Sequence, residues 1–161
     1  MEKALFGAGC FWGVEDFFRQ VPGVSAAVSG YAGGVTQRPT YRQVCAGDTN
    51  HAEVVEVSFD PAQVSYATLV DLFFKMHNPT TLNRQGPDVG TQYRSVIFTH
   101  GDEQARVAKV RRDAASTRFR QPIVTTIEPA PAFWPAEDYH QRYFEKNGGT
   151  CHVSYAEVAN R

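Results

Sequence analysis

The order of its strand-like and helix-like segments is the feature that most restricts the fold of this chain. Alternating or short bounded apolar runs indicate strands, and apolar residues spaced at i, i+4 and i+7 indicate helices. The clearest strand is residues 53–59, and the clearest helix is residues 64–77, in which Leu69, Phe73 and Met76 share one face. The predicted strands are residues 3–6, 24–31, 53–59, 94–99 and 124–128, and the predicted helices are residues 11–20, 64–77, 102–116 and 135–146.

This order, β-α-β-β-α-β followed by α-β-α, predicts an α+β fold. Its first six elements match a split βαβ, ferredoxin-like two-layer sandwich, and the remaining elements are additions to it. Two long polar loops cover residues 32–52 and 78–92, and the C-terminal tail from residue 147 is expected to be irregular. The chain has no internal repeat and no linker, so residues 1–161 are predicted to form a single domain.

Charge and hydropathy exclude several kinds of partner. The chain has 16 Lys and Arg against 17 Asp and Glu, a formal net charge of -1, which favours neither nucleic acid nor an anionic membrane surface. No apolar run approaches the roughly 18 residues of a membrane span, and the opening segment does not resemble a signal peptide. We therefore expect a cytoplasmic protein with no membrane partner, and we expect a monomer.

The cysteine content points to redox chemistry rather than to structural disulfides. The three cysteines, Cys10, Cys45 and Cys151, are an odd number and form no CxxC motif. The five histidines have no metal-ligand spacing, so we expect no metal. In a reducing compartment, a disulfide in this chain would be transient and catalytic.

Cys10 stands at the junction of the first predicted strand and helix. A thiol attacks as the thiolate, its ordinary pKa is about 8.5, and a helix N-terminus favours the charged form. Gly9 allows a tight turn, and Phe11 and Trp12 put aromatic faces beside the sulfur. The pattern indicates a nucleophilic or redox cysteine, and the alternative is a buried cysteine in a glycine-rich turn.

Four other polar residues are candidates for the same site. Glu53 enters an apolar strand, and burial there would raise the pKa of its carboxyl group and keep it protonated as an acid. Tyr41 lies in the first long loop and Tyr93 directly follows the second, and both offer hydroxyl donors; Asp88 lies in a turn. Taken singly, each also fits a plain structural role: a solvated strand end, aromatic packing or a turn cap.

A second thiol could complete a redox cycle. Cys151 follows two glycines, Gly148 and Gly149, on a segment able to swing, as a resolving cysteine requires. Cys45 lies in the first long loop and could resolve instead, or it could be a partly buried structural thiol.

Six motifs, taken together, carry a specific resemblance. They are GCFWG at residues 9–13, VSGYAGG at 28–34, PTYRQVC at 39–45, HAEVV at 51–55, NRQGPDVGTQYRS at 83–95 and AEDYHQ at 136–141. In this order they resemble the signature of the A-type peptide methionine sulfoxide reductases. The resemblance covers residues 4 to about 146.

The resemblance implies a reaction in which no organic cofactor takes part. Cys10 would attack the sulfur of methionine S-sulfoxide, free or within an oxidised protein or peptide. Glu53 would protonate the sulfoxide oxygen, while Tyr41 and Tyr93 would hydrogen-bond it. The product methionine would leave Cys10 as a sulfenic acid, so the enzyme would repair oxidised proteins.

The resemblance also implies how the substrate is held and how the enzyme is recycled. Phe11 and Trp12 would hold the methyl group of the substrate, and Asp88 would position its backbone or amino group. A disulfide between Cys10 and Cys151 would then be reduced by thioredoxin.

Two other interpretations remain open on the residues alone. Cys10 followed by aromatic residues, with His140 far downstream, faintly resembles a papain-like cysteine hydrolase. A non-catalytic module could also use the aromatic pocket to bind a methyl-bearing ligand.

Overall fold

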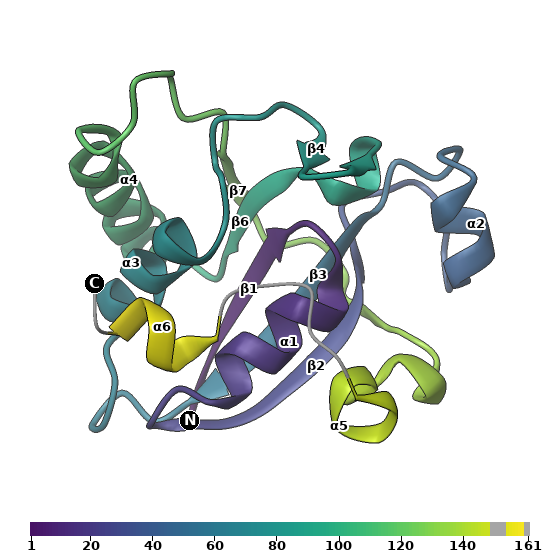
Figure 1. The fold of residues 1–161 in the computed structure, drawn as a ribbon, viewed down its shortest axis with the longest axis horizontal. Coiled ribbons are helices and arrows are strands. Elements are labelled where there is room, and N and C mark those ends of the chain that lie inside the picture. Colours follow the sequence, from purple (N-terminus) through teal and green to yellow (C-terminus); the bar gives the residue numbers. More distant parts are fainter. Residues whose placement is uncertain (149–153, 160–161) are drawn as a thin grey trace.

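The computed structural model describes residues 1–148 and 154–159 and is built on one six-stranded sheet (Figure 1). The strands of this sheet are β1 (Glu2–Ala8), β2 (Val24–Ala32), β3 (Ala52–Phe59), β6 (Ser95–Thr99), β7 (Thr126–Pro129) and β8 (Trp134–Pro135). The helices are α1 (Phe11–Arg19), α2 (Tyr41–Cys45), α3 (Tyr66–Met76), α4 (Asp102–Ser116), α5 (Tyr143–Asn147) and α6 (Tyr155–Ala159). A separate two-stranded hairpin is made of β4 (Arg84–Gln85) and β5 (Asp88–Val89).

The strand order confirms the predicted split βαβ core. The sheet runs β7-β6-β1-β3-β2-β8, and β1 pairs antiparallel with both β3 and β6, while β2 pairs antiparallel with β3. The parallel strands β1 and β2 are thus separated by β3, as a ferredoxin-like arrangement requires. The additions are β7, parallel to β6, and β8, antiparallel to β2.

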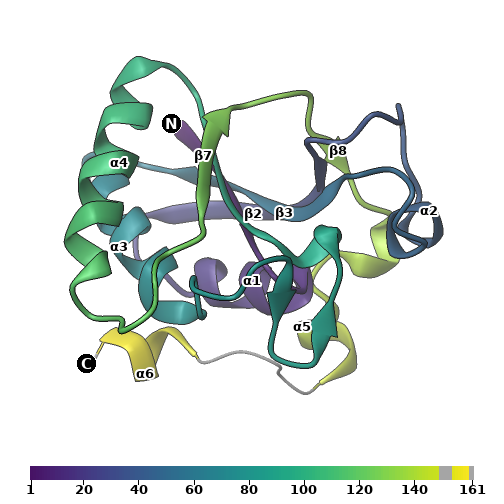
Figure 2. The same cartoon turned by 90° about the horizontal axis from the view of Figure 1, so that it is seen from above.

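Side chains on the two faces of the sheet enter two separate apolar clusters. On the helix-covered face, Phe6 of β1 stacks on Phe18 of α1 and contacts Phe73 of α3, with ring centroids 5.1 and 5.2 Å away. On the other face, Leu5 joins a smaller cluster against which Phe133 packs. Figure 2 shows the link between β7 and β8 crossing this second side of the sheet. Strand alternation therefore decides which side chains face α1.

The first long loop contains a helix that we did not predict. Helix α2 begins after Thr40, whose side chain accepts a hydrogen bond from the backbone N–H of Gln43, while the Gln43 side chain accepts one from the N–H of Thr40. This reciprocal arrangement is a capping box. The second long loop, 78–92, likewise contains the β4–β5 hairpin and is followed by a short 3-10 turn, Thr91–Tyr93.

The predicted helix at residues 135–146 is wrong as a single element. Pro135 pairs with Gly30 in β8, a 3-10 turn covers Asp138–His140, and α5 begins only at Tyr143. The helix is interrupted at Arg142, whose φ of 54° is left-handed and whose N–H donates to the buried carboxylate of Glu15. A tertiary hydrogen bond therefore outweighs the local helical pattern.

The tail is also more regular than predicted. Helix α6 packs the buried side chain of Val158 into the main core, and Tyr155 contacts Phe17 of α1 edge-on. Among the described residues, no helix combines the length and apolar character needed to cross a bilayer.

Candidate active site

Cys10 occupies the N-cap position of α1, as the sequence predicts. Its φ and ψ of -57° and 122° are non-helical, and the residue is half-buried. The preceding Gly9 has a φ of 94°, which side chains rarely tolerate, so a glycine is needed for this turn. A Cβ at Gly7 would lie 2.8 Å from Val96, which explains the second glycine. The thiol is therefore presented at the positive end of a helix dipole.

Glu53 lies directly beneath the start of this helix. It is 1% exposed, and it lies on the same face of β3 as Val55 and Val57, toward α1. Its Oε1 accepts a hydrogen bond from the backbone N–H of Phe11, at 3.2 Å. The first turn of α1 thus presents the thiol of Cys10 and binds the carboxyl group of Glu53.

Tyr41 and Tyr93 bring two hydroxyl groups to the same place from different loops. Tyr41 is the first residue of α2, and Tyr93 ends the 3-10 turn before β6. Burial raises the pKa of each phenol above the ordinary value of 10.0. Both hydroxyls therefore stay protonated near neutral pH and remain hydrogen-bond donors. Cys10 and Asp88 also interact electrostatically with Tyr93.

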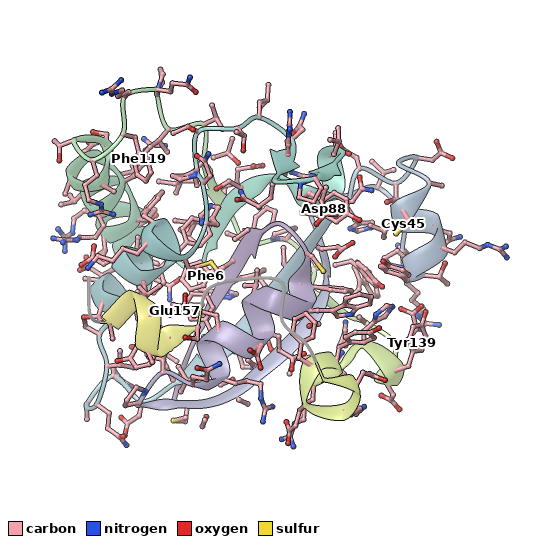
Figure 3. The ribbon with its side chains drawn as sticks, in the orientation of Figure 1. Phe6, Cys45, Asp88, Phe119, Tyr139 and Glu157 are labelled. Atoms are coloured by element: carbon pink, nitrogen blue, oxygen red, sulfur yellow. The ribbon has the colours of Figure 1, made fainter. Side chains whose placement is uncertain are left out.

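Cys45 lies close to both hydroxyls. It is four residues after Tyr41, so the two side chains share one face of α2, and its thiol hydrogen-bonds with Tyr41 and with Tyr93. Burial raises the pKa of this thiol, although the hydrogen bonds from the two tyrosines oppose the rise. Figure 3 shows Cys45 on the same side of the molecule as Asp88.

An aromatic wall begins directly after Cys10, with Phe11 and Trp12, whose rings both stack on Tyr41. The indole of Trp12 stacks on Tyr143 with ring centroids 3.7 Å apart and an interplanar angle of 5°. Phe11 is fully buried beneath Tyr41 and Tyr31, so Trp12, which is half-buried, forms the accessible part of the wall. This wall suits an apolar group such as a methyl.

Glu137 was not predicted from the sequence as a site residue, and His140 was considered only as the histidine of a cysteine hydrolase. Glu137 accepts hydrogen bonds from Tyr31 and Tyr41, and only its place in the AEDYHQ motif hinted at such a role. His140 is buried; its ring lies 4.3 Å from that of Tyr41, and its Nδ1 accepts a hydrogen bond from the Trp12 indole N–H at 2.9 Å. Burial lowers the pKa of His140, which keeps it neutral.

The loop before Glu53 is braced by His51. Its Nδ1 accepts a hydrogen bond from the N–H of Gly34, and its Nε2 lies 2.6 Å from the carbonyl oxygen of Thr36. A Cβ at Gly34 would lie 2.4 Å from the His51 ring, so only glycine fits there. His51 is thus used for structure. Within the described residues, no group of three potential metal-ligating side chains occurs.

Asp88 and Cys151 are the remaining residues that the sequence places in the site. Asp88 is half-buried at the start of β5, within electrostatic reach of Tyr93. Cys151, the predicted resolving cysteine, lies outside the described residues. Hydrogen-bond and electrostatic contacts thus bring Cys10, Glu53, Tyr41 and Tyr93 together around the start of α1.

Comparisons with known sequences agree over almost the whole chain. A family profile described as peptide methionine sulfoxide reductase matches residues 2–161. A relative from Methanoculleus marisnigri, a peptide methionine sulfoxide reductase MsrA, is 60% identical over 92% of this chain and 92% of its own. Another of the same name, from Acidobacterium capsulatum, is 57% identical over 95% of this chain and 100% of its own.

Solved structures share the fold. Methionine sulfoxide reductase A of Corynebacterium diphtheriae has a TM-score of 0.88 and 42% identity, covering 93% of this chain and 77% of that one. Reduced Mxr1 from Saccharomyces cerevisiae has a TM-score of 0.89 and 37% identity, covering 93% and 87%. Mxr1 in complex with Trx2 has a TM-score of 0.66 and 26% identity, covering 95% and 88%.

These findings give no support to the papain-like alternative. The relatives are reductases, and Nδ1 of His140 is engaged by Trp12. Within the described part of the chain, Nε2 of His140 has no hydrogen-bond partner. A hydrolase would instead need this imidazole to take the proton of Cys10.

Proposed function

The chain belongs to the peptide methionine sulfoxide reductase family, and from that premise we propose that Cys10 is the nucleophile which attacks the sulfur of methionine S-sulfoxide. The chain is an oxidoreductase that reduces methionine sulfoxide. One observation carries the proposal: a buried carboxyl group and two protonated tyrosine hydroxyls lie around the helix start that presents this cysteine.

Protonation of the sulfoxide oxygen is the step that needs an acid. Oxygen is a poor leaving group until it is protonated, and we assign this proton to Glu53. The support is its position: it is 1% exposed and is bonded to the N–H of Phe11, one residue from the nucleophile. The hydroxyls of Tyr41 and Tyr93 would donate hydrogen bonds to the same oxygen as charge develops on it.

Substrate binding would use the aromatic wall and the hairpin. The half-buried indole of Trp12, with Phe11 beneath Tyr41, supports a site for the methyl group of the sulfoxide. Asp88 on β5 would position the backbone or amino group of the substrate, and we take both free methionine sulfoxide and oxidised peptides as substrates. The assignment of the S epimer rests on the family resemblance.

The redox balance is carried by thiols. Cys10 thiol and sulfoxide give methionine and Cys10 sulfenic acid, so the substrate sulfur is reduced and the cysteine sulfur is oxidised. A second thiol condenses with the sulfenic acid, forming an S–S bond and releasing water. We assign this second thiol to Cys151, with Cys45 as the alternative because its sulfur lies beside Tyr41 and Tyr93.

A dithiol protein would then reduce the disulfide and regenerate the enzyme. We propose thioredoxin for this step, supported by the solved complex of Mxr1 with Trx2. We take residues 1–161 to act as a single domain, as a monomer and in the cytoplasm.

A single-turnover thiol titration tests the proposal. Reduced protein is mixed with one equivalent of a methionine S-sulfoxide peptide without reductant, and thiols and disulfides are mapped by mass spectrometry. We expect one methionine, the loss of two thiols and a Cys10–Cys151 disulfide; the R epimer is the control. A Cys10–Cys45 disulfide would keep the reaction and change the resolving residue. No methionine with three intact thiols would overturn the proposal.

A further inference from the structure

We propose that Glu137 is a positioning residue for Tyr41, fixing that hydroxyl relative to Glu53. The inference rests on the proposed function, because it assumes that the Tyr41 hydroxyl takes part in the reaction. Glu137 precedes the 3-10 turn Asp138–His140, between β8 and α5.

The carboxylate of Glu137 collects three hydrogen bonds from three parts of the chain. Its Oε1 accepts one from the Tyr31 hydroxyl at 3.0 Å. Its Oε2 accepts one from the backbone N–H of Tyr41 at 3.1 Å and one from the Tyr139 hydroxyl at 3.2 Å. Figure 3 shows Tyr139 on the same side of the molecule as Cys45 of α2. Glu137 therefore ties α2 to the sheet.

The charge of Glu137 makes these bonds strong. Burial acts to raise the pKa of this carboxyl group, but the hydrogen bonds from Tyr41, Tyr31 and Tyr139 outweigh it, and the pKa is lowered. The group is thus ionised at neutral pH, and hydrogen bonds to an ionised acceptor are shorter and stronger than neutral ones.

Helix α2 needs such an anchor because it is only five residues long. A helix of that length is not stable by itself, so its orientation depends on caps and tertiary contacts. The capping box of Thr40 and Gln43 is local and fixes nothing relative to the sheet.

The anchor point in the sheet is next to the proposed acid. Tyr31 of β2 is the register partner of Glu53 of β3, and paired residues of antiparallel strands share a face. The path from Glu53 through Tyr31 and Glu137 to Tyr41 therefore sets the distance between the acid and the hydroxyl. Loss of Glu137 would leave that distance free to vary.

A double-mutant cycle tests whether Glu137 acts through Tyr41. We expect Glu137→Gln to lower kcat about tenfold, with KM changed less than about twofold, because a misplaced donor affects the transition state more than substrate binding. In a Tyr41→Phe background the same substitution should cost less than about twofold. Glu145→Gln on α5, an exposed glutamate with no contact to Tyr41, is the matched control.

Hydrogen exchange supplies a readout independent of activity. The Tyr41 N–H donates to Glu137, so Glu137→Gln should speed deuterium exchange at residues 40–46 but not in β3. If Glu137→Gln does not fold, Tyr31→Phe removes the link to the sheet and should give the same two effects at smaller size.

Several outcomes would overturn the inference. Unchanged exchange at residues 40–46, or an equal loss of kcat with and without the Tyr41 hydroxyl, would show that Glu137 does not act through Tyr41. An impaired Tyr41→Phe with a fully active Glu137→Gln would remove only the positioning role. A fully active Tyr41→Phe would remove the proposed hydroxyl role as well.

Discussion

The carboxyl group of Glu53 lies 3.2 Å from the backbone N–H of Phe11 and accepts a hydrogen bond from it. This bond links the middle of the sheet to the first turn of the helix that Cys10 begins. Because the strand that carries Glu53 and the helix that Cys10 begins are both rigid, the acid and the nucleophile are held in one geometry before substrate arrives. The site is thus pre-organised by the core of the fold.

Removing the acid should abolish most of the activity without unfolding the protein. We expect Glu53→Gln to lower kcat by about 10²- to 10³-fold, the usual range for loss of a general acid. Methionine release in a single turnover measures this. Glu56→Gln, on the same strand, is the matched control because Glu56 only pairs with exposed Lys3 at 3.0 Å. Equal activity in the two variants would contradict the assignment of Glu53.

The two tyrosines should share the stabilisation of the sulfoxide oxygen. We expect Tyr41→Phe and Tyr93→Phe each to lower kcat about tenfold, since one donor remains, and the double variant to lose about 10³-fold. Tyr155→Phe removes a tyrosine hydroxyl on α6 and should be fully active, so it controls for the effect of the substitution itself. A double variant no worse than either single one would mean that only one hydroxyl serves the reaction.

The sequence predicted the parts of the site that depend on local pattern. A strand that ends in glycines before a cysteine-led helix places Cys10 at an N-terminus whatever the rest of the fold does. Strand alternation puts Glu53 on the inner face together with Val55. Helix α2 was also predictable, because Thr40 and Gln43 are spaced as a capping box, but the long polar loop concealed it.

The parts that failed depend on contacts between distant residues. Residues 135–146 carry a helical pattern, yet the Arg142 N–H is shared between the two carboxylate oxygens of Glu15, and Pro135 pairs with Gly30. Neither partner is visible from the local sequence. The same applies to Glu137, whose partner Tyr41 lies in another loop. Long-range hydrogen bonds, rather than propensity, decide these segments.

Cys45 should react slowly for an exposed cysteine. Its pKa is raised chiefly by burial of the sulfur, so less thiolate is present at neutral pH than for an ordinary cysteine. We expect alkylation of Cys45 by iodoacetamide near neutral pH to be slower than that of the denatured chain, followed by mass spectrometry. Removing a hydrogen-bond donor in Tyr41→Phe should slow it further. Alkylation as fast as in the denatured chain would contradict the raised pKa.

The pH dependence of stability should reveal the buried Glu15. Burial raises its pKa above 4.5, although the hydrogen bonds from Ser29 and Arg142 oppose the rise. As pH increases, the unfolded chain releases this proton before the folded chain does. The folded state then binds more protons, and its stability falls between the unfolded and the folded pKa.

Glu15→Gln removes this titration, so it isolates the effect. We expect the free energy of unfolding of the native chain, minus that of Glu15→Gln, to decrease as the pH rises above 4.5 in urea titrations. Glu103→Gln is a control with the opposite expected sign, because the hydrogen bond from Arg106 lowers the pKa of Glu103. The free energy of unfolding of the native chain, minus that of Glu103→Gln, should therefore increase with pH. A constant difference for Glu15 would mean that its carboxyl group titrates alike in both states. The bond to the Arg142 N–H would then keep the buried group charged.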